Sequence, residues 1–223
     1  VNSFTGINDT VWIYFESSFC NNMDWTGATG FPIFYTFSNT PTQINGSIIC
    51  NPAMKIWSPF EMTGSDTSFV TTNGLTIPGI TFTGTGTFKL ADNLTVKSVL
   101  NVENGIFQTN NHLVNCNAFI FGSNWDSTVV DLGTSTIYCT ERFNGKLNNN
   151  CTFIGNNANV ILNDTIGGTT LGLGGLDLIL NDITFITKGG LGGGITCNNI
   201  IAYADFGAYN LLTANSIFIE GNA

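Results

Sequence analysis

The sequence predicts an all-β protein built as a solenoid, in which short strands and sharp corners repeat as stacked coils. Residues 99–121 show this most clearly, because short apolar runs of branched and aromatic residues alternate with polar corners. The runs are too short for helices and favour strands. The corners Glu103-Asn104-Gly105 and Thr109-Asn110-Asn111 contain residue types that tolerate left-handed backbone angles. One such coil cannot bury its own apolar face, so the pattern requires similar neighbours.

Similar phrases of strand, corner and strand follow along the chain at a spacing of about 20–30 residues, the range of β-solenoid repeats. They occur at 129–138, 152–162, 176–187, 199–204 and 210–220. Corner lengths vary, so the repeat has no strict period. We expect the side chains that point into the coils to include Val102, Phe107, Val114, Phe119, Leu132, Ile137, Phe153 and Ile161.

The pattern in residues 1–80 predicts less regular coils of the same architecture. The pattern in residues 81–223 predicts regular coils. Strand-like segments at 10–15, 23–25, 33–37, 48–50 and 55–57 alternate with corners rich in Asn, Gly, Pro and Ser. Four of the five prolines lie in this part, beside strand starts or in loops, where a missing N–H does little harm. No linker or charge run divides the chain, so we predict one domain spanning residues 1–223.

Composition supports a solenoid and excludes several classes of partner. Only 9% of the 223 residues are charged, against roughly 25% in ordinary globular domains. Amphipathic helices need long charged side chains on their outer faces, and this chain has few of them. The net charge is −9 with six Lys plus Arg, which argues against binding to nucleic acid and to anionic membrane surfaces.

The six cysteines, at positions 20, 50, 116, 139, 151 and 197, form no CxxC pair, so zinc and thioredoxin-like sites are not indicated. Most lie inside strand phrases, where small buried thiols are the favoured interpretation. One or two bridges between stacked coils are the alternative. No apolar run approaches the ~18 residues of a membrane span. The chain opens on Val1-Asn2-Ser3-Phe4 without a signal peptide, and we expect an internal segment of a longer protein.

Several phrases, in matching order along nearly the whole chain, resemble a repeat module of very large surface proteins. They include 20–29 (CNNMDWTGAT), 44–48 (INGSI), 82–94 (FTGTGTFKLADNL), 104–112 (NGIFQTNNH) and 132–137 (LGTSTI). Proteins with this module belong to Bacteroidota, and many are adhesin-like or gliding-associated products exported by the type IX secretion system. The resemblance implies a single right-handed parallel β-helix on the cell exterior. It does not imply a particular ligand.

No catalytic residue and no cofactor are predicted. Catalysis needs a positioned acid, base or nucleophile, and the one histidine, His112, falls in a corner phrase. Polysaccharide lyases of this shape need a cationic base, whereas the chain has one arginine, Arg142, and five scattered lysines. Hydrolases need paired carboxylates. The nearest candidates, Asp126 and Asp131, are best explained as solvated corner residues.

Metal binding is not predicted either. Residues 172–180 nearly match the calcium-binding nonapeptide of RTX repeats. The match lacks one glycine and occurs once, whereas that site draws its ligands from successive repeats.

Glycan contact and glycosylation are the binding features that the sequence offers. Exposed aromatic side chains could stack on sugar rings, and the candidates are Trp125, Trp25 and Trp57. Interior stacks or caps are the favoured interpretation of Trp25 and Trp57, whereas Trp125, in a polar corner, is the better candidate for an exposed aromatic. The resemblance implies O-glycosylation at Asp-Ser/Thr followed by a small or aliphatic residue, which fits Thr10 and Thr165.

Three classes of function fit these features. The preferred one is a non-catalytic structural or adhesive segment of a large cell-surface or filament protein, located outside the cell. Its partners would be surface glycans or other surface proteins. The alternatives are a phage tail fibre or spike that attaches to host glycans, and a carbohydrate-active β-helix enzyme. Trimerisation would favour the fibre, and glycan depolymerisation would favour the enzyme.

Overall fold

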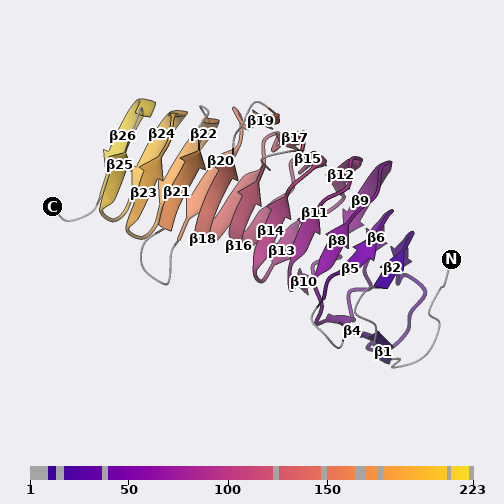
Figure 1. Ribbon diagram of the computed structural model, residues 1–223. Helices are drawn as coiled ribbons and strands as arrows, with labels where there is room; N and C mark the ends of the chain where they lie inside the picture. The colour runs from indigo at the N-terminus through magenta and orange to yellow at the C-terminus, as the bar shows by residue number, and fades with distance from the viewer. Residues whose placement is uncertain are drawn as a thin grey trace.

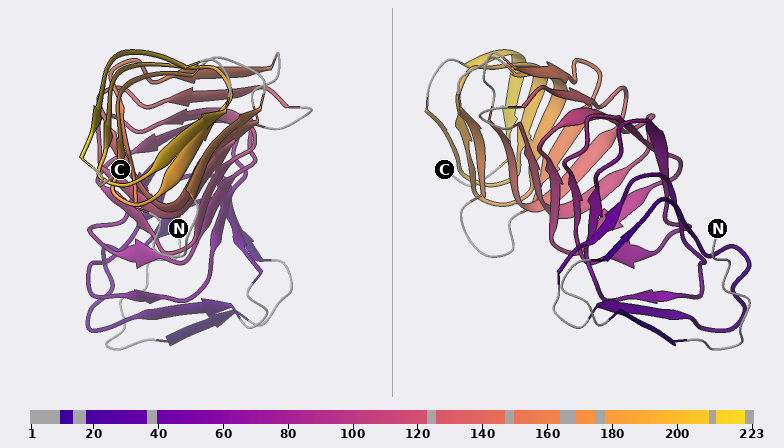
Figure 2. Two further views of the ribbon diagram at one scale, coloured as in Figure 1. Left: turned by 90° about the vertical axis from the view of Figure 1, so that its left-hand side faces the viewer. Right: turned by 45° about the vertical axis from the view of Figure 1, so that its right-hand side comes forward.

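The computed structural model describes residues 10–13, 18–36, 40–122, 126–146, 150–163, 169–174, 178–209 and 212–220. Within these ranges the chain is all-β, and parallel strands stack in coils from the N-terminal end to β26 (Figure 1). The view along the stack shows the coils enclosing a common interior (Figure 2, left). The predicted β-helix (β-solenoid) is therefore confirmed. The described residues include no helix that could cross a membrane.

Each coil has three faces, named here in the order in which the chain passes through them. The first face begins as a separate three-stranded sheet, β1-β4-β7, and continues from β10 onward in the main sheet. Its strands are β1 (Thr10–Ile13), β4 (Ile33–Thr36), β7 (Lys55–Ile56), β10 (Thr76–Ile77), β13 (Leu94–Val96) and β20 (Asn159–Leu162). Parts of five longer strands complete it: β16 (Val114–Phe121), β18 (Thr136–Lys146), β22 (Leu178–Phe185), β24 (Ile195–Ala202) and β26 (Leu212–Ile219).

The second face carries the short strands that follow the first corner, together with the second halves of β16 and β18. Its other strands are β2 (Ser18–Cys20), β5 (Thr42–Ile44), β8 (Phe60–Met62), β11 (Ile80–Phe82), β14 (Val99–Val102), β21 (Thr169–Gly174), β23 (Gly189–Gly192) and β25 (Phe206–Tyr209). The third face is a seven-stranded sheet. It contains β3 (Met23–Asp24), β6 (Ile48–Ile49), β9 (Thr67–Thr71), β12 (Thr87–Leu90), β15 (Gly105–Gln108), β17 (Thr128–Asp131) and β19 (Cys151–Ile154).

The strand register gives the coil length directly. Gln43 pairs with Glu61, which follows it by 18 residues. The coil lengthens to 23 residues where Cys116 pairs with Cys139. It shortens to 17 residues where Asp182 pairs with Asn199. The 23-residue coil lies within the expected spacing and the 17- and 18-residue coils lie below it, and the corners absorb the variation.

One continuous hydrophobic core runs through the described coils from Met23 to Ala202. Side chains of one type stack in register along it, so each coil covers the apolar face of the previous one. An aliphatic ladder on the first face consists of Leu94, Val114, Ile137, Val160, Ile183 and Ile200. A chain of phenylalanines from Phe82 to Phe153 fills the middle of the solenoid, with ring centroids 4.8–6.2 Å apart. The single-domain assignment stays a prediction, although this core is unbroken.

Most of the predicted inward positions are confirmed, and one is wrong. Val102, Phe107, Val114, Phe119, Leu132 and Ile137 are fully buried. Phe153 is half-buried and stacks on Phe121 with ring centroids 5.2 Å apart. Ile161 points outward, because its neighbours Val160 and Leu162 take the inward positions of β20.

All six cysteines lie in the described part of the chain and are free thiols. Cys116 and Cys139 are register partners, with their sulfur atoms 3.7 Å apart. The interpretation as core thiols is therefore confirmed for the five that are buried, while Cys20 is half-buried.

One buried hydroxyl makes a stability prediction possible. Ser68 is 1% exposed, and its Oγ has no hydrogen-bond partner among the described residues. Ser68→Ala is therefore expected to raise the free energy of unfolding by about 1 kcal/mol, because an unsatisfied polar atom leaves the core. Chemical denaturation measures the change.

Ser135→Ala is the matched control, since Ser135 is equally buried but its hydroxyl bonds Thr109 Oγ1 at 2.7 Å. This substitution leaves Thr109 without that partner and should lower stability by about 1 kcal/mol. If Ser68→Ala and Ser135→Ala changed the free energy of unfolding in the same direction, the prediction would be contradicted.

Candidate functional site

Three prolines line up on the corner between the first and second faces. Pro41 and Pro59 directly precede β5 and β8, and Pro78-Gly79 precedes β11. Because Thr42, Phe60 and Ile80 are register partners, the residues before them lie on the same corner of consecutive coils. Proline is tolerated there because a strand start can lack one N–H donor. The corner therefore presents rigid apolar rings in a row along the solenoid axis.

These prolines border a shallow open groove of about 380 Å³. Its rim is formed by Trp57, Pro41, Pro59, Pro78, Thr81 and Ser98, and its floor by Phe60 and Ile80. Trp57 is 59% exposed, while the floor residues are buried. The backbone N–H of Trp57 donates to Phe34 O at 3.0 Å, which fixes the residue to the neighbouring coil. We call this feature the Trp57 groove.

Polar side chains adjoin the groove on the second face. Glu61 is the register partner of Thr81 and accepts hydrogen bonds from Gln43 Nε2 at 3.1 Å and Thr83 Oγ1 at 2.9 Å. Amide, hydroxyl and carboxylate groups thus lie on the second face next to Thr81, which lines the groove. This combination suits a ligand with flat apolar faces and a hydroxylated rim, as sugars have.

The structure separates the three predicted glycan-contact tryptophans. Trp57 lies exposed in the groove, so it stays a candidate for glycan contact and the interior position favoured for it is wrong. Trp25 was a wrong candidate: it is 1% exposed and packs edge-on against Phe34, with ring centroids 6.2 Å apart. Its position after the short strand β3 turns the indole into the core. Trp125 lies outside the described residues. Of the other aromatics in this region, Phe34 is buried and Tyr35 half-buried.

The two predicted O-glycosylation sites stay predictions. Thr10 is the first residue of β1, which places its backbone on the first face at the N-terminal end of the stack. Thr165 lies outside the described residues.

The candidate catalytic groups are held apart or engaged in structural contacts. His112 is half-buried in a turn, where its backbone N–H donates to Thr109 O at 3.0 Å. Glu61 and Glu103 lie on the same face but two coils apart, at least about 9.5 Å between backbones. The Asp131 carboxylate accepts from Gly133 N at 3.0 Å. No group of three or more His, Cys, Asp or Glu suited to a metal ion occurs among the described residues.

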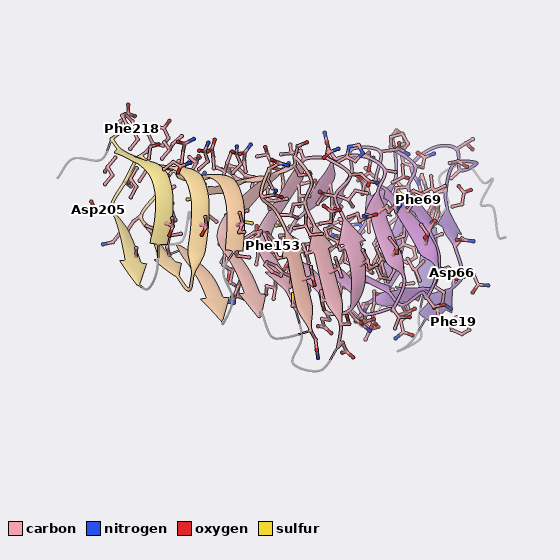
Figure 3. The ribbon with its side chains drawn as sticks, turned by 90° about the horizontal axis from the view of Figure 1, so that it is seen from above. Phe19, Asp66, Phe69, Phe153, Asp205 and Phe218 are labelled. Carbon is pink, nitrogen blue, oxygen red and sulfur yellow. The ribbon has the colours of Figure 1, made fainter. Side chains whose placement is uncertain are left out.

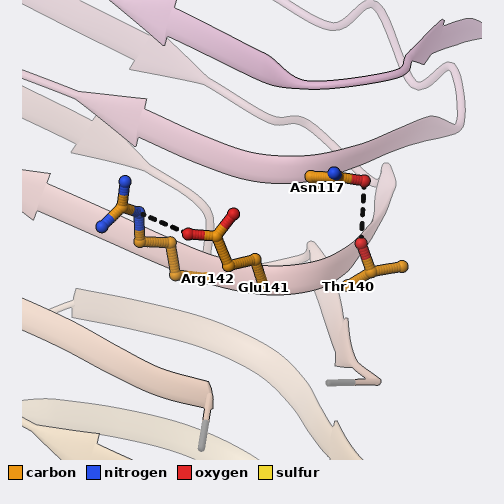
Figure 4. Close-up of polar contacts among 4 residues, drawn as sticks. All are labelled: Asn117, Thr140, Glu141 and Arg142. Atoms are coloured by element: carbon orange, nitrogen blue, oxygen red, sulfur yellow. Dashed lines mark hydrogen bonds and ion pairs between the residues drawn. The ribbon is translucent and has the colours of Figure 1, made fainter. Parts of the chain in front are cut away.

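The arginine is engaged in a surface ion pair, and burial lowers the reactivity of the Cys50 thiol. Arg142 Nε contacts Glu141 Oε1 at 3.7 Å on the solenoid surface, beside an inter-coil bond from Thr140 Oγ1 to Asn117 Oδ1 (Figure 4). Burial raises the pKa of the Cys50 thiol to about 12, and the nearby Asp92 carboxylate adds to the effect. Such a thiol stays protonated at neutral pH and is a poor nucleophile.

Sequence reasoning missed the prolines as part of a site. Pro41, Pro59 and Pro78 recur at nearly the interval that separates the register partners Thr42, Phe60 and Ile80. That recurrence was a usable signal, since residues one coil apart must become neighbours. The chain matches no protein-family model, no curated protein sequence and no solved structure.

Proposed function

We propose that this chain is a non-catalytic structural and adhesive segment of a large cell-surface or filament protein, and that it attaches to surface glycans through the Trp57 groove. The observation that carries the proposal is the groove itself. An indole that is 59% exposed, prolines on three successive coils and hydroxyl groups form one continuous recess. An exposed apolar recess with a polar rim is a characteristic binding feature.

The solenoid supports the structural part of the proposal. Parallel pairing joins every described coil to the next, and the unbroken core makes the stack a rod. Because each coil contacts only its neighbours along the axis, the stack is extended. Such a rod would hold a binding groove at a distance from the surface to which the longer protein is attached. The location outside the cell is supported by the resemblance to surface modules.

Trp57→Ala tests the adhesive part. Binding of the 223-residue chain to its glycan, found on an array and measured by calorimetry, should weaken by at least about tenfold because ring stacking is lost. The fold should remain intact, since Trp57 lies outside the core. Phe69→Ala is the matched control, because Phe69 is 45% exposed on the third face (Figure 3), whereas the groove lies at the corner between the first and second faces. Equal losses in both variants would contradict the proposal.

The non-catalytic part has its own test. Polysaccharides that bind the chain should be recovered at their original length after prolonged incubation. Depolymerisation that disappears in Glu61→Ala, with stability unchanged, would instead make the protein an enzyme. A stable trimer in solution would favour the fibre of a phage.

A further inference from the structure

Two lysines flank the Trp57 groove. Lys55 lies two residues before Trp57, and both side chains are exposed while Ile56 between them faces the other way. Two residues of strand place their backbones about 6.6 Å apart. Lys97 directly precedes Ser98 of the groove rim, and its N–H donates to Ile77 O at 2.8 Å. It therefore sits in the coil after Pro78, about two coil spacings or 9.5 Å along the axis from Trp57.

Neither ammonium group forms an ion pair within the described part of the chain. The ion pair found there joins Arg142 to Glu141, far along the solenoid. The whole chain has only six Lys and Arg against 15 Asp and Glu, so carboxylates are plentiful. Lys55 and Lys97 have no carboxylate partner within the described part of the chain, and they lie near an exposed indole. They therefore create a local positive region on an acidic protein.

An acidic side chain lies on the other side of the groove. Glu61 is on the second face, around the corner from Lys55, and its carboxylate is already engaged by Gln43 and Thr83. The groove is thus cationic along the first face and acidic along the second. A ligand that carries carboxylates along one edge fits this distribution of charge.

We propose that the Trp57 groove binds an acidic polysaccharide built from uronic acid residues. The indole of Trp57 stacks on a sugar ring, and Lys55 and Lys97 pair with ring carboxylates at the ligand's edge. In a pyranose uronate the carboxylate projects from the ring edge, so stacking leaves it free to reach a flanking ammonium. This inference rests on the proposed function and adds to it the class of glycan.

The test uses the 223-residue chain and a panel of uronate oligosaccharides, containing galacturonate, glucuronate, mannuronate or guluronate. Each is paired with its carboxyl-reduced counterpart, which keeps length and linkage but has no charge. Calorimetry should show binding to at least one acidic member about tenfold tighter than to its reduced form. Lys55→Met and Lys97→Met should each weaken acidic binding by about two- to fivefold and leave the reduced form unaffected. The exposed Lys188, on a distant corner, gives the control Lys188→Met, which should change neither.

The other outcomes separate this inference from the proposed function. Equal binding of acidic and reduced forms, lost in Trp57→Ala, would overturn the acidic assignment and leave glycan attachment standing. Binding of neutral glycans alone would do the same. Binding of a proline-rich peptide and of no glycan would overturn both, as would the absence of any glycan ligand on the panel and on a general array.

Discussion

Val114→Asp is expected to unfold the central coils of the solenoid. Val114 is fully buried and stands in the aliphatic ladder between Leu94 and Ile137. A carboxylate there has no partner and no water, so the substitution should lower the free energy of unfolding by roughly 3–5 kcal/mol. Chemical denaturation followed by circular dichroism measures the loss. Because each coil contacts only its neighbours, proteolysis should first appear near residue 114 rather than at the ends.

The next residue provides the matched control. Asn115 lies on the same strand but points outward, half-exposed, between Thr95 and Tyr138. Asn115→Asp introduces the same charge one position away and should change stability by no more than about 0.5 kcal/mol. If both variants lost stability equally, net charge rather than burial would be responsible, and the inward assignment of Val114 would be contradicted.

Strands and corners were predictable because their signals are local. The left-handed corners at Gly105, Asn110 and Asn111 are present, with φ angles of 74°, 50° and 65°. It was harder to predict which side chains of a strand point into the core. In 159–162 (NVIL) three apolar residues are adjacent, so alternation alone does not say whether Ile161 or its neighbours face inward. Register with Tyr138 and Thr184 decides it, and register comes from neighbouring coils.

The Trp57 groove was less predictable than the fold because its residues come from four coils. Trp57 could be proposed by itself as an exposed aromatic. Its partners Pro41, Pro78 and Ser98 join it only when the local coil length is known. That length is not constant along the chain, because corners differ in size from one coil to the next. Trp25 shows the opposite outcome. An interior stack was its favoured interpretation, and the turn after β3 carries it into contact with Phe34.

Gly105→Ala should destabilise the protein by about 3 kcal/mol or more, although it adds only one methyl group. Gly105 stands at the corner between the second and third faces with a φ of 74°, which disfavours any L side chain. A Cβ there would lie 2.5 Å from Gly84 O and 2.6 Å from Gly86 O, and both are backbone atoms of the previous coil. The two coils would have to separate at this corner, which adds an overpacking penalty to the backbone strain.

Gly74→Ala separates these two causes. Gly74 has a similar φ of 79°, but nothing lies within 4 Å of the position that a Cβ would take. Its substitution should therefore show the backbone strain alone, about 1 kcal/mol. Denaturation of both variants side by side measures the difference, which reports how closely adjacent coils approach at the corner. Equal losses of stability in the two variants would mean that the coils can separate at Gly105 at no cost in free energy. The close approach of the two backbones would then not explain why this position requires glycine.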